Sequence, residues 1–291
     1  MGERITNAPI TNAMTVDIED YFQVGAFETV VSRDDWGQFK GRVERNTRAC
    51  LDLFESEGVS ATFFTLGWVA ERHPALIREI VARGHELASH GYAHDRVHDF
   101  TPEAFRADLR KSRALLEDAG GVRVRGYRAP SFSIGKKNAW AQEIIAEEGY
   151  VYSSSVAPIQ SDHYGWPEAP RFAHLPVAGS DLIEIPVSTV EYGGRRFACG
   201  GGGFFRLLPY RFSEWAIARI NETDGQPAMF YFHPWEIDPD QPRIPGAPLK
   251  SRLRHYTKLD VMEAKLRRAL QRFRWDRVDR VFLGETLQKA A

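Results

Sequence analysis

Two histidines four residues apart, His90 and His94, lie among small residues directly after a segment typical of a β-strand. Imidazole is the side chain that most often binds metal ions, and two imidazoles at this spacing can close on one ion from a single turn of backbone. A catalytic metal site also needs a carboxylate ligand and groups that transfer protons. If the histidine pair is functional, other parts of the chain are expected to supply these groups.

An acidic cluster ends the first strand-like segment, which covers residues 12–22. Asp17, Glu19 and Asp20 fall within four positions, and their mutual repulsion is relieved when a cation sits between them. Because side chains alternate along a strand, Asp17 and Glu19 are expected to share one face, whereas Asp20 points away or begins the next loop. The cluster is consistent with a metal or acid–base site, and a solvated turn is the alternative.

Two further polar groups follow strand-like segments. Arg128 ends the segment at 124–132, and His233 ends the apolar segment at 228–236. An arginine can hold a carboxylate base ionised, and a histidine can protonate a leaving amine. Together with a bound divalent ion, these groups would suit hydrolysis of an amide through a tetrahedral intermediate.

Apolar runs and helical patterns alternate along the first half of the chain, which predicts a parallel sheet with helices outside it. In such sheets, functional groups collect at the carboxyl ends of the strands, where the residues above fall. The expected strands are 12–22, 59–66, 85–90, 124–132 and 150–156, and the expected helices are 34–57, 71–83, 101–119 and 138–148.

The pattern breaks between residues 157 and 210, where proline and glycine are frequent. The run Gly200–Gly203 is expected to be a flexible or tightly turned surface loop, because no Gly-Lys-Ser/Thr follows it as in a phosphate-binding loop. After this segment, the pattern predicts a helix at 212–221, a strand at 228–236, a loop at 238–248, a helix at 259–273 and a final strand at 281–283.

Composition limits the class of protein. The chain has 291 residues, 43% of them hydrophobic, and a net charge of −1, which argues against a nucleic-acid binder. No window resembles a membrane span, and residues 1–13 lack the apolar core of a signal peptide, so the chain is expected to be cytoplasmic. Cys50 and Cys199 are too few for a disulfide framework, and Cys50 is expected to be a buried apolar residue.

The motifs, in this order, resemble those of the polysaccharide deacetylases, the NodB-homology domains of carbohydrate esterase family 4. The resemblance extends from about Met14 to Glu236 and includes Asp17-Ile18-Glu19-Asp20, His90-Gly91-Tyr92-Ala93-His94, Arg128-Ala129-Pro130 and Phe230-Tyr231-Phe232-His233. The Val-Asp-Ile-Glu-Asp-Tyr-Phe opening, the glycine-rich Phe-Phe-Arg-Leu-Leu-Pro-Tyr segment and His-Pro-Trp-Glu further resemble the subgroup found with exosortase (PEP-CTERM) exopolysaccharide loci.

This resemblance implies an α/β fold, a distorted (β/α)7-type barrel with an irregular Gly/Pro-rich insertion and a C-terminal helical extension. It implies one catalytic domain over residues 14–291, with the core motifs in 14–236 and the extension in 237–291. It also implies a divalent metal, usually zinc, and removal of N-acetyl groups from an amino-sugar-containing saccharide in exopolysaccharide biosynthesis. An oligomeric state is not indicated.

Roles for individual residues follow from the same resemblance. Asp17 would be the catalytic base, oriented by Arg128, and His233 the catalytic acid. His90 and His94 would be metal ligands. The third ligand would be Glu19 or Asp20, because the second acid of the common motif is displaced in this chain. Substrate contacts would come from Pro130, Ser131, Phe132 and Trp235.

One departure from the family pattern concerns the acid. The stretch Tyr152-Ser153-Ser154-Ser155 lacks an aspartate that many members carry, which leaves open what tunes His233. Two other functions are compatible with the motifs, namely hydrolysis of a cyclic or small amide, as in allantoinase-like relatives, and carbohydrate binding without catalysis. The intact set of Asp17, His90, His94, Arg128 and His233 argues against the last of these.

Overall fold

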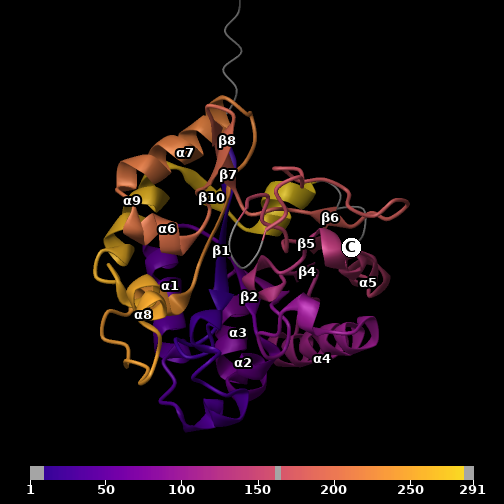
Figure 1. Ribbon diagram of the computed structural model, residues 1–291, viewed down its shortest axis with the longest axis vertical. Coiled ribbons are helices and arrows are strands. Elements are labelled where there is room, and N and C mark those ends of the chain that lie inside the picture. The colour runs from indigo at the N-terminus through magenta and orange to yellow at the C-terminus, as the bar shows by residue number, and fades with distance from the viewer. Residues whose placement is uncertain (1–9, 161–164, 285–291) are drawn as a thin grey trace, which may run out of the picture.

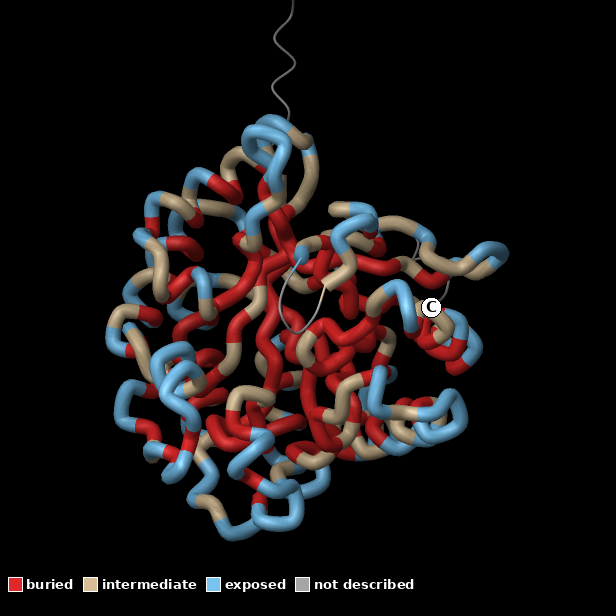
Figure 2. The backbone as a smooth tube through the Cα atoms, viewed as in Figure 1, coloured by how far each residue is buried: buried red, intermediate tan, exposed pale blue. Residues whose placement is uncertain are grey.

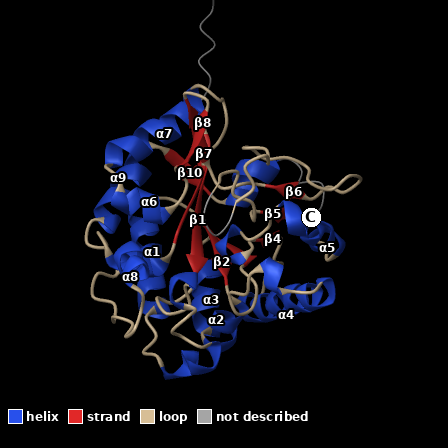
Figure 3. Cartoon of the chain, in the orientation of Figure 1, coloured by secondary structure: helices blue, strands red, loops and turns tan. Residues whose placement is uncertain are grey.

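A central parallel sheet is surrounded by helices in the computed structural model, which describes residues 10–160 and 165–284 (Figure 1, Figure 3). The strands are β1 (Thr11–Ile18), β2 (Thr62–Thr65), β3 (Glu86–Ser89), β4 (Gly126–Tyr127), β5 (Tyr152–Ser153), β6 (Ile183–Glu184), β7 (Thr189–Tyr192), β8 (Arg195–Ala198), β9 (Met229–Phe232) and β10 (Arg274–Asp276). The helices are α1 (Val43–Glu57), α2 (Gly67–Arg72), α3 (Pro74–Ala82), α4 (Pro102–Gly120), α5 (Trp140–Glu147), α6 (Gly202–Leu207), α7 (Tyr210–Glu222), α8 (Leu249–Tyr256) and α9 (Met262–Arg272).

The strand order is that of a distorted barrel. Strands β1 to β6 pair in sequence order, all parallel, and β9 pairs in parallel with β1, so that seven strands run in the order β9-β1-β2-β3-β4-β5-β6. The two ends of this series lie close together. The backbone N–H of Met229 in β9 donates to the hydroxyl of Ser188, a few residues after β6, at 2.7 Å. The predicted (β/α)7-type fold is confirmed.

Strand β1 separates the core from the functional face. Its residues Met14, Val16 and Ile18 are fully buried in the main hydrophobic cluster, which fills the space between the sheet and the helices (Figure 2). Because side chains alternate along a strand, Asp17 projects to the opposite face, and Glu19 follows on that face just beyond the strand end. The same alternation therefore buries the apolar residues of β1 in the core and directs Asp17 and Glu19 toward the carboxyl end of the barrel.

Helix α4 shows how local sequence sets an element. The hydroxyl of Thr101 accepts from the backbone N–H of Ala104 at 3.2 Å, Pro102 opens the helix, and Gly121 follows it with φ 66°. The predicted helix at 101–119 is therefore confirmed.

Two predicted helices of the first half are wrong in extent. The helix expected at 34–57 begins only at Val43, after a short 3₁₀ turn over Arg33–Gln38. The helix expected at 71–83 is two helices, α2 and α3, that meet at Pro74. Proline has no backbone N–H to continue the first helix, so the second begins there.

The second half contains more regular structure than predicted. The segment 157–210 includes β6, the antiparallel hairpin β7–β8 and the helix α6, and α8 follows the loop that begins after residue 237. The final strand expected at 281–283 is wrong, because residues Asp279–Leu283 form a π-helical turn. The last strand among the described residues, β10, pairs with Thr11–Ala13 of β1, so the C-terminal extension contributes to the sheet.

Cys50 and Cys199 are both buried and form no disulfide. Within residues 10–160 and 165–284, no helix combines the length and the apolar character that a membrane span requires.

Candidate active site

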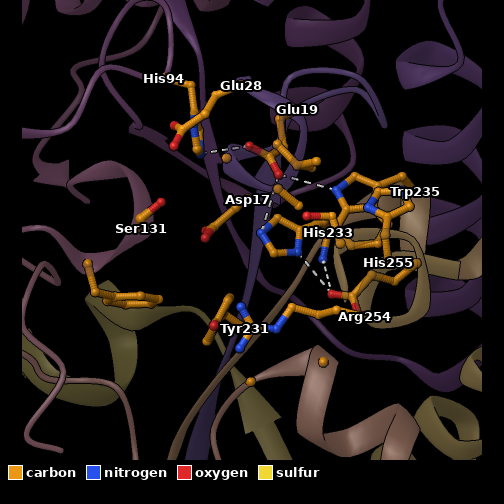
Figure 4. A pocket seen from close by; sticks show the side chains of 18 of the residues that line it. Asp17, Glu19, Glu28, His94, Ser131, Tyr231, His233, Trp235, Arg254 and His255 are labelled. Carbon is orange, nitrogen blue, oxygen red and sulfur yellow. Dashed lines mark hydrogen bonds and ion pairs between the residues drawn. The ribbon is translucent and has the colours of Figure 1, made fainter. Parts of the chain in front are cut away.

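A cavity of about 550 Å³ lies at the carboxyl ends of the strands and is lined by residues from both halves of the chain (Figure 4). Of the residues predicted from the sequence, those that line the cavity are Asp17, Glu19, His90, His94, Ser131, Phe132, His233 and Trp235. Arg128 lies beneath it, fully buried.

Glu19, His90 and His94 form a cluster suited to a metal ion. One ligand atom from each residue lies within 4.8 Å of the others. The Nε2 atom of His94 is 2.9 Å from Oε2 of Glu19, and this buried oxygen accepts no hydrogen bond from the described residues. Two imidazoles and one carboxylate are a donor set that zinc favours, and a buried carboxylate oxygen without a donor is what a cation would satisfy. The residues present therefore fit a divalent ion.

His90 is held in the tautomer that a metal ligand needs. Its Nδ1–H donates to the carbonyl oxygen of Arg128 at 2.9 Å, because a carbonyl can only accept, and Nε2 is left with its lone pair. Burial lowers the pKa of His90 to about 4, so the imidazole is neutral at physiological pH. The loop to His94 turns through Gly91 at φ 74° and His94 itself at φ 56°, which brings the two rings to 5.5 Å between centroids.

Asp20 is directed away from this cluster. Its Oδ2 accepts from the backbone N–H groups of Arg42 and Val43 at 2.7 and 3.0 Å, and its Oδ1 accepts from that of Tyr21 at 2.9 Å. The carboxylate therefore satisfies the free N–H groups at the start of α1. Of the two acids considered as third metal ligand, Glu19 lies with the imidazoles and Asp20 does not.

Asp17 and Arg128 form a buried ion pair. Nη1 of Arg128 donates to Oδ1 of Asp17 at 2.6 Å and to the hydroxyl of Thr15 at 2.8 Å. The guanidinium is fixed on its other side by the hydroxyl of Ser154 at 3.1 Å, and it lies 3.9 Å from the centroid of the Phe64 ring. Asp17 is thus held in one orientation by a charge-assisted hydrogen bond.

His233 is oriented by a carboxylate that the sequence analysis did not identify. Its Nδ1 lies 2.9 Å from Oε1 of Glu236, which also accepts from the backbone N–H of His233 at 3.1 Å. Oε2 of Glu236 in turn accepts from Nε of Arg206 at 2.7 Å, and both of these side chains are 1% exposed. With Nδ1 occupied, Nε2 of His233 is turned toward Glu19, 3.5 Å away.

Trp235 connects His233 and Glu19. Its Nε1–H donates to Oε1 of Glu19 at 3.2 Å, and its ring stacks on the imidazole of His233 with centroids 5.1 Å apart (Figure 4). Burial raises the pKa of Glu19, but the charges of His94 and His233 outweigh it and lower the pKa to about 2. Burial lowers the pKa of His233, but the charge of Glu19 and the hydrogen bond with Glu236 raise it to about 9.

The Arg128-Ala129-Pro130 segment continues into an unusual turn. Ser131 and Phe132 have φ values of 56° and 49°, a conformation that L residues rarely adopt and that is often found at functional sites. The turn brings both residues to the cavity wall, and Phe132 packs against Tyr231 with ring centroids 4.7 Å apart. Pro130 is buried and is not among the lining residues.

The prediction of a surface loop at Gly200–Gly203 is wrong for its first three residues, which are buried. A Cβ atom at Gly200 would lie 2.6 Å from the carbonyl oxygen of Met229, and one at Gly201 would lie 2.8 Å from the Tyr231 ring. A Cβ atom at Gly202 would overlap the carboxylate of Glu236. The glycines therefore let α6 and the chain before it approach β9 and the acid closely.

Glu236 and Arg206 are the main residues missed from the sequence. Glu236 was part of the His-Pro-Trp-Glu motif, and its position three residues after a histidine at a strand end was a usable signal. Arg206 was part of the Phe-Phe-Arg-Leu-Leu-Pro-Tyr segment, but nothing local indicated its partner, which lies 30 residues further along the chain.

Comparisons with known families divide the chain in two. Residues 31–152 match the family described as "Polysaccharide deacetylase", and residues 154–283 match the family described as "Domain of unknown function (DUF3473)". The boundary falls within β5, at Ser153, and Asp17, Glu19, His233 and Glu236 lie outside the residues matched to the first family.

Curated relatives match part of the chain. The chain is 30% identical over 98 residues to a peptidoglycan-N-acetylglucosamine deacetylase of Bacillus cereus, which is 33% of this chain and 36% of that protein. It is 30% identical over 120 residues to a peptidoglycan deacetylase of Helicobacter pylori, 41% of this chain and 39% of that protein. It is 34% identical over 97 residues to a chitooligosaccharide deacetylase of Bradyrhizobium, 33% of this chain and 42% of that protein. The chain thus spans less than half the length of these relatives.

Solved structures share the fold over nearly the whole chain. A putative polysaccharide deacetylase from Mycobacterium smegmatis aligns with a TM-score of 0.63 and 21% identity, covering 99% of this chain and 94% of that one. A Puue allantoinase aligns with a TM-score of 0.55 and 17% identity, covering 86% of this chain and 87% of that one. These findings show that the chain shares the fold of these structures and that residues 31–152 match the polysaccharide deacetylase family.

Proposed function

We propose that this protein is a metal-dependent hydrolase that removes N-acetyl groups from an amino-sugar-containing saccharide. The observation that carries the proposal is the meeting of three sets of groups in one cavity: the Glu19, His90 and His94 cluster, the Asp17–Arg128 pair and the His233–Glu236 pair. The curated relatives are peptidoglycan and chitooligosaccharide deacetylases, which supports an N-acetylated saccharide as the substrate.

Glu19, His90 and His94 would hold the divalent ion, and we propose zinc because two imidazoles and one carboxylate are a common zinc donor set. When bound, such an ion acidifies a water molecule and polarises a carbonyl oxygen. The pair of His90 Nδ1 with the Arg128 carbonyl would keep the ligand ring in place, as hydrogen bonds from metal-binding histidines generally do.

The proton transfers are assigned to Asp17 and His233. Asp17, oriented through Oδ1 by Arg128, would take a proton from the water that attacks the acetamido carbonyl. His233, oriented through Nδ1 by Glu236, would donate a proton from Nε2 to the amide nitrogen as the C–N bond breaks. Water and amide are thereby converted to acetate and a free amine. Glu236 would thus orient His233, the role left open by the missing aspartate in the 152–155 stretch.

The test is acetate release from N-acetylated chitooligosaccharides and peptidoglycan fragments by the metal-loaded protein, with allantoin as the probe for cyclic ureides. We expect acetate from at least one saccharide, and an at least 100-fold loss in His94→Ala. His98→Ala is the matched control, because His98 is on the same loop, half exposed and outside the cavity. Turnover of allantoin alone, or saccharide binding without acetate release, would contradict the proposal.

We further propose that the substrate is an exopolysaccharide, on the resemblance of the Val-Asp-Ile-Glu-Asp-Tyr-Phe opening and the His-Pro-Trp-Glu motif to proteins of exosortase-linked loci. Residues 154–283 supply part of the cavity wall, and they match a different family from the one shared with the peptidoglycan deacetylases. Faster acetate release from an N-acetylated exopolysaccharide than from peptidoglycan fragments would support this assignment, and the reverse order would contradict it.

A further inference from the structure

A strongly basic segment borders the cavity. Residues 242–258, which include α8, contain five Lys and Arg residues and no Asp or Glu, although the whole chain has 38 basic and 39 acidic residues. The five are Arg243, Lys250, Arg252, Arg254 and Lys258. Such a local excess creates a positive potential that attracts anions.

Two of these cations face the substrate cavity. Lys250 and Arg254 are one helical turn apart on α8, and both line the cavity that also contains Asp17 and His233. Arg252 lies on the same helix and is not among the lining residues. The cavity volume of about 550 Å³ is within the usual range for small-molecule sites, about 300–1,000 Å³, so it has room for more than an acetamido group.

The acids in the cavity already have partners. The four lining carboxylates each lie beside a cation or an imidazole, at 2.6 to 2.9 Å, in the pairs Asp17–Arg128, Glu19–His94, Glu28–Arg96 and Glu236–Arg206. Arg254 is exposed, and among the described residues its guanidinium has neither an ion pair nor a hydrogen bond with another side chain. The cavity therefore contains a cation whose charge no lining carboxylate neutralises.

The backbone carbonyl of Arg254 is held by the arginine that also contacts Glu236. Nη2 of Arg206 donates to the carbonyl oxygen of Arg254 at 3.1 Å, and Nε of the same Arg206 donates to Glu236, the partner of His233. The backbone of α8 is thus tied to the group that orients the acid. A substrate anion bound by Arg254 would lie in the same cavity as Asp17 and His233.

We propose that Arg254, with Lys250 beside it, forms an anion subsite that binds a carboxylate or phosphate carried by the saccharide next to the N-acetylated sugar. The assignment rests on the proposed saccharide function. Arginine suits it because its planar guanidinium forms paired hydrogen bonds with carboxylate and phosphate oxygens. The substrate class that follows is an acidic, N-acetylated saccharide.

A membrane surface is the other partner that a basic helix could contact, since Leu249 and Leu253 are 69% and 59% exposed on α8. The saccharide is favoured because Lys250 and Arg254 line the cavity that contains the reacting groups. An anionic membrane is therefore included as an outcome of the test.

The test compares equilibrium binding of two tetrasaccharides to the full chain at low salt. One is a hyaluronan tetrasaccharide, with carboxylates beside N-acetylglucosamine, and the other is the neutral tetra-N-acetylchitotetraose. We expect the acidic ligand to bind about tenfold more tightly, and Arg254→Gln to abolish most of this preference, as for loss of a charged hydrogen bond. Arg252→Gln, which removes the same charge from the same helix, should leave the preference within about twofold. N-acetylglucosamine 1-phosphate, compared with N-acetylglucosamine, distinguishes phosphate from carboxylate as the anion.

Equal binding of the acidic and neutral ligands, or no binding of either, would overturn the subsite. An equal loss of preference in Arg254→Gln and Arg252→Gln would also overturn it. The same holds if Arg254→Gln weakens binding to phosphatidylglycerol vesicles but leaves saccharide binding unchanged. Binding does not depend on acetate release, so the two proposals fail separately. If Arg254→Gln loses the preference for the acidic ligand but the unmodified protein releases no acetate, only the proposed activity is contradicted. If neutral and acidic substrates release acetate equally well, and Arg254→Gln does not change this, only the proposed subsite is contradicted.

Discussion

The two halves of the chain build the candidate active site by different means. The first half, up to about residue 156, places Asp17, His90 and Arg128 at the ends of paired parallel strands, so the register of the sheet brings them together. The second half supplies His233 in the same way, from β9, but it holds this histidine through Glu236 and Arg206, which depend on α6 packing closely on the strand.

The two halves therefore depend on different features of the sequence, a local strand–helix pattern in the first and contacts between distant segments in the second. In the first half a repeating pattern of strand and helix is enough to put polar groups at one edge. In the second half, the arrangement depends on contacts between the glycine run and β9, where even a methyl group would collide with Met229 or Glu236. The contrast can be tested at Glu19, at Glu236, in the glycine run and at His85.

The largest effect is expected at Glu19. Glu19→Ala should reduce divalent-ion affinity and acetate release by more than the roughly 10–100-fold typical of residues that only support a ligand. Asp20→Ala should retain the ion, because this carboxylate accepts from Arg42 and Val43 at the start of α1, and should instead lower the free energy of unfolding by about 1–2 kcal/mol. Metal analysis and urea unfolding of both variants distinguish them, and loss of metal in Asp20→Ala alone would reverse the assignment.

At Glu236, we expect Glu236→Gln to lower kcat for acetate release by roughly 100-fold, the lower end of what a general acid contributes, with metal content unchanged. The reason is loss of the carboxylate that orients His233 through Nδ1. Glu148→Gln is the matched control, since Glu148 is also a nearly buried acid with arginine partners but is not among the cavity-lining residues. Similar kcat values for the two variants would show that Glu236 only supports the fold.

The glycine run gives a smaller effect, on stability. Gly202→Ala would place a methyl group into the Glu236 carboxylate and should lower the free energy of unfolding by about 1–3 kcal/mol. Gly203→Ala meets no atom within 4 Å and should be neutral or about 0.5–1 kcal/mol more stable, as expected for alanine over glycine in a helix. Equal unfolding midpoints in urea would mean that α6 does not need to approach the acid closely.

The smallest effect is a pH dependence that originates in the first half, away from the cavity. Burial lowers the pKa of His85 to about 4 from its usual 6.5, and its Nδ1 accepts from the backbone N–H of Ala61. Between these pH values the unfolded chain binds the extra proton, so stability falls as pH falls, by about 1 kcal/mol per pH unit. His85→Gln should flatten this part of the profile in urea unfolding between pH 7 and 4. If the slope of unfolding free energy against pH is unchanged in His85→Gln, a group other than His85 causes the pH dependence.

Much of the first half could be predicted from the sequence. Alternation along β1 gave a shared face for Asp17 and Glu19, and the apolar runs gave the positions of the parallel strands. Element limits were less accurate where a single residue decides them, as Pro74 does between α2 and α3.

The second half was harder for a physical reason. Strand β6 is only two residues long, and α8 buries little more than His255, so neither has the repeating apolar pattern that a sequence displays. The buried pair of Arg206 and Glu236 joins residues far apart in the chain, and no local pattern indicates such a pair. His233 was predicted because it ends a clear apolar strand, whereas its supporting groups were not.

The central claim is that Glu19, His90 and His94 meet around one divalent ion. The most direct measurement is a titration of the metal-free protein with Co²⁺, followed by absorbance. We predict saturation at one ion per chain with the spectrum of a nitrogen- and oxygen-ligated site, and loss of this binding in His94→Ala but not in His98→Ala. Saturation at no ion, or an identical titration for His94→Ala and the unmodified chain, would contradict the account.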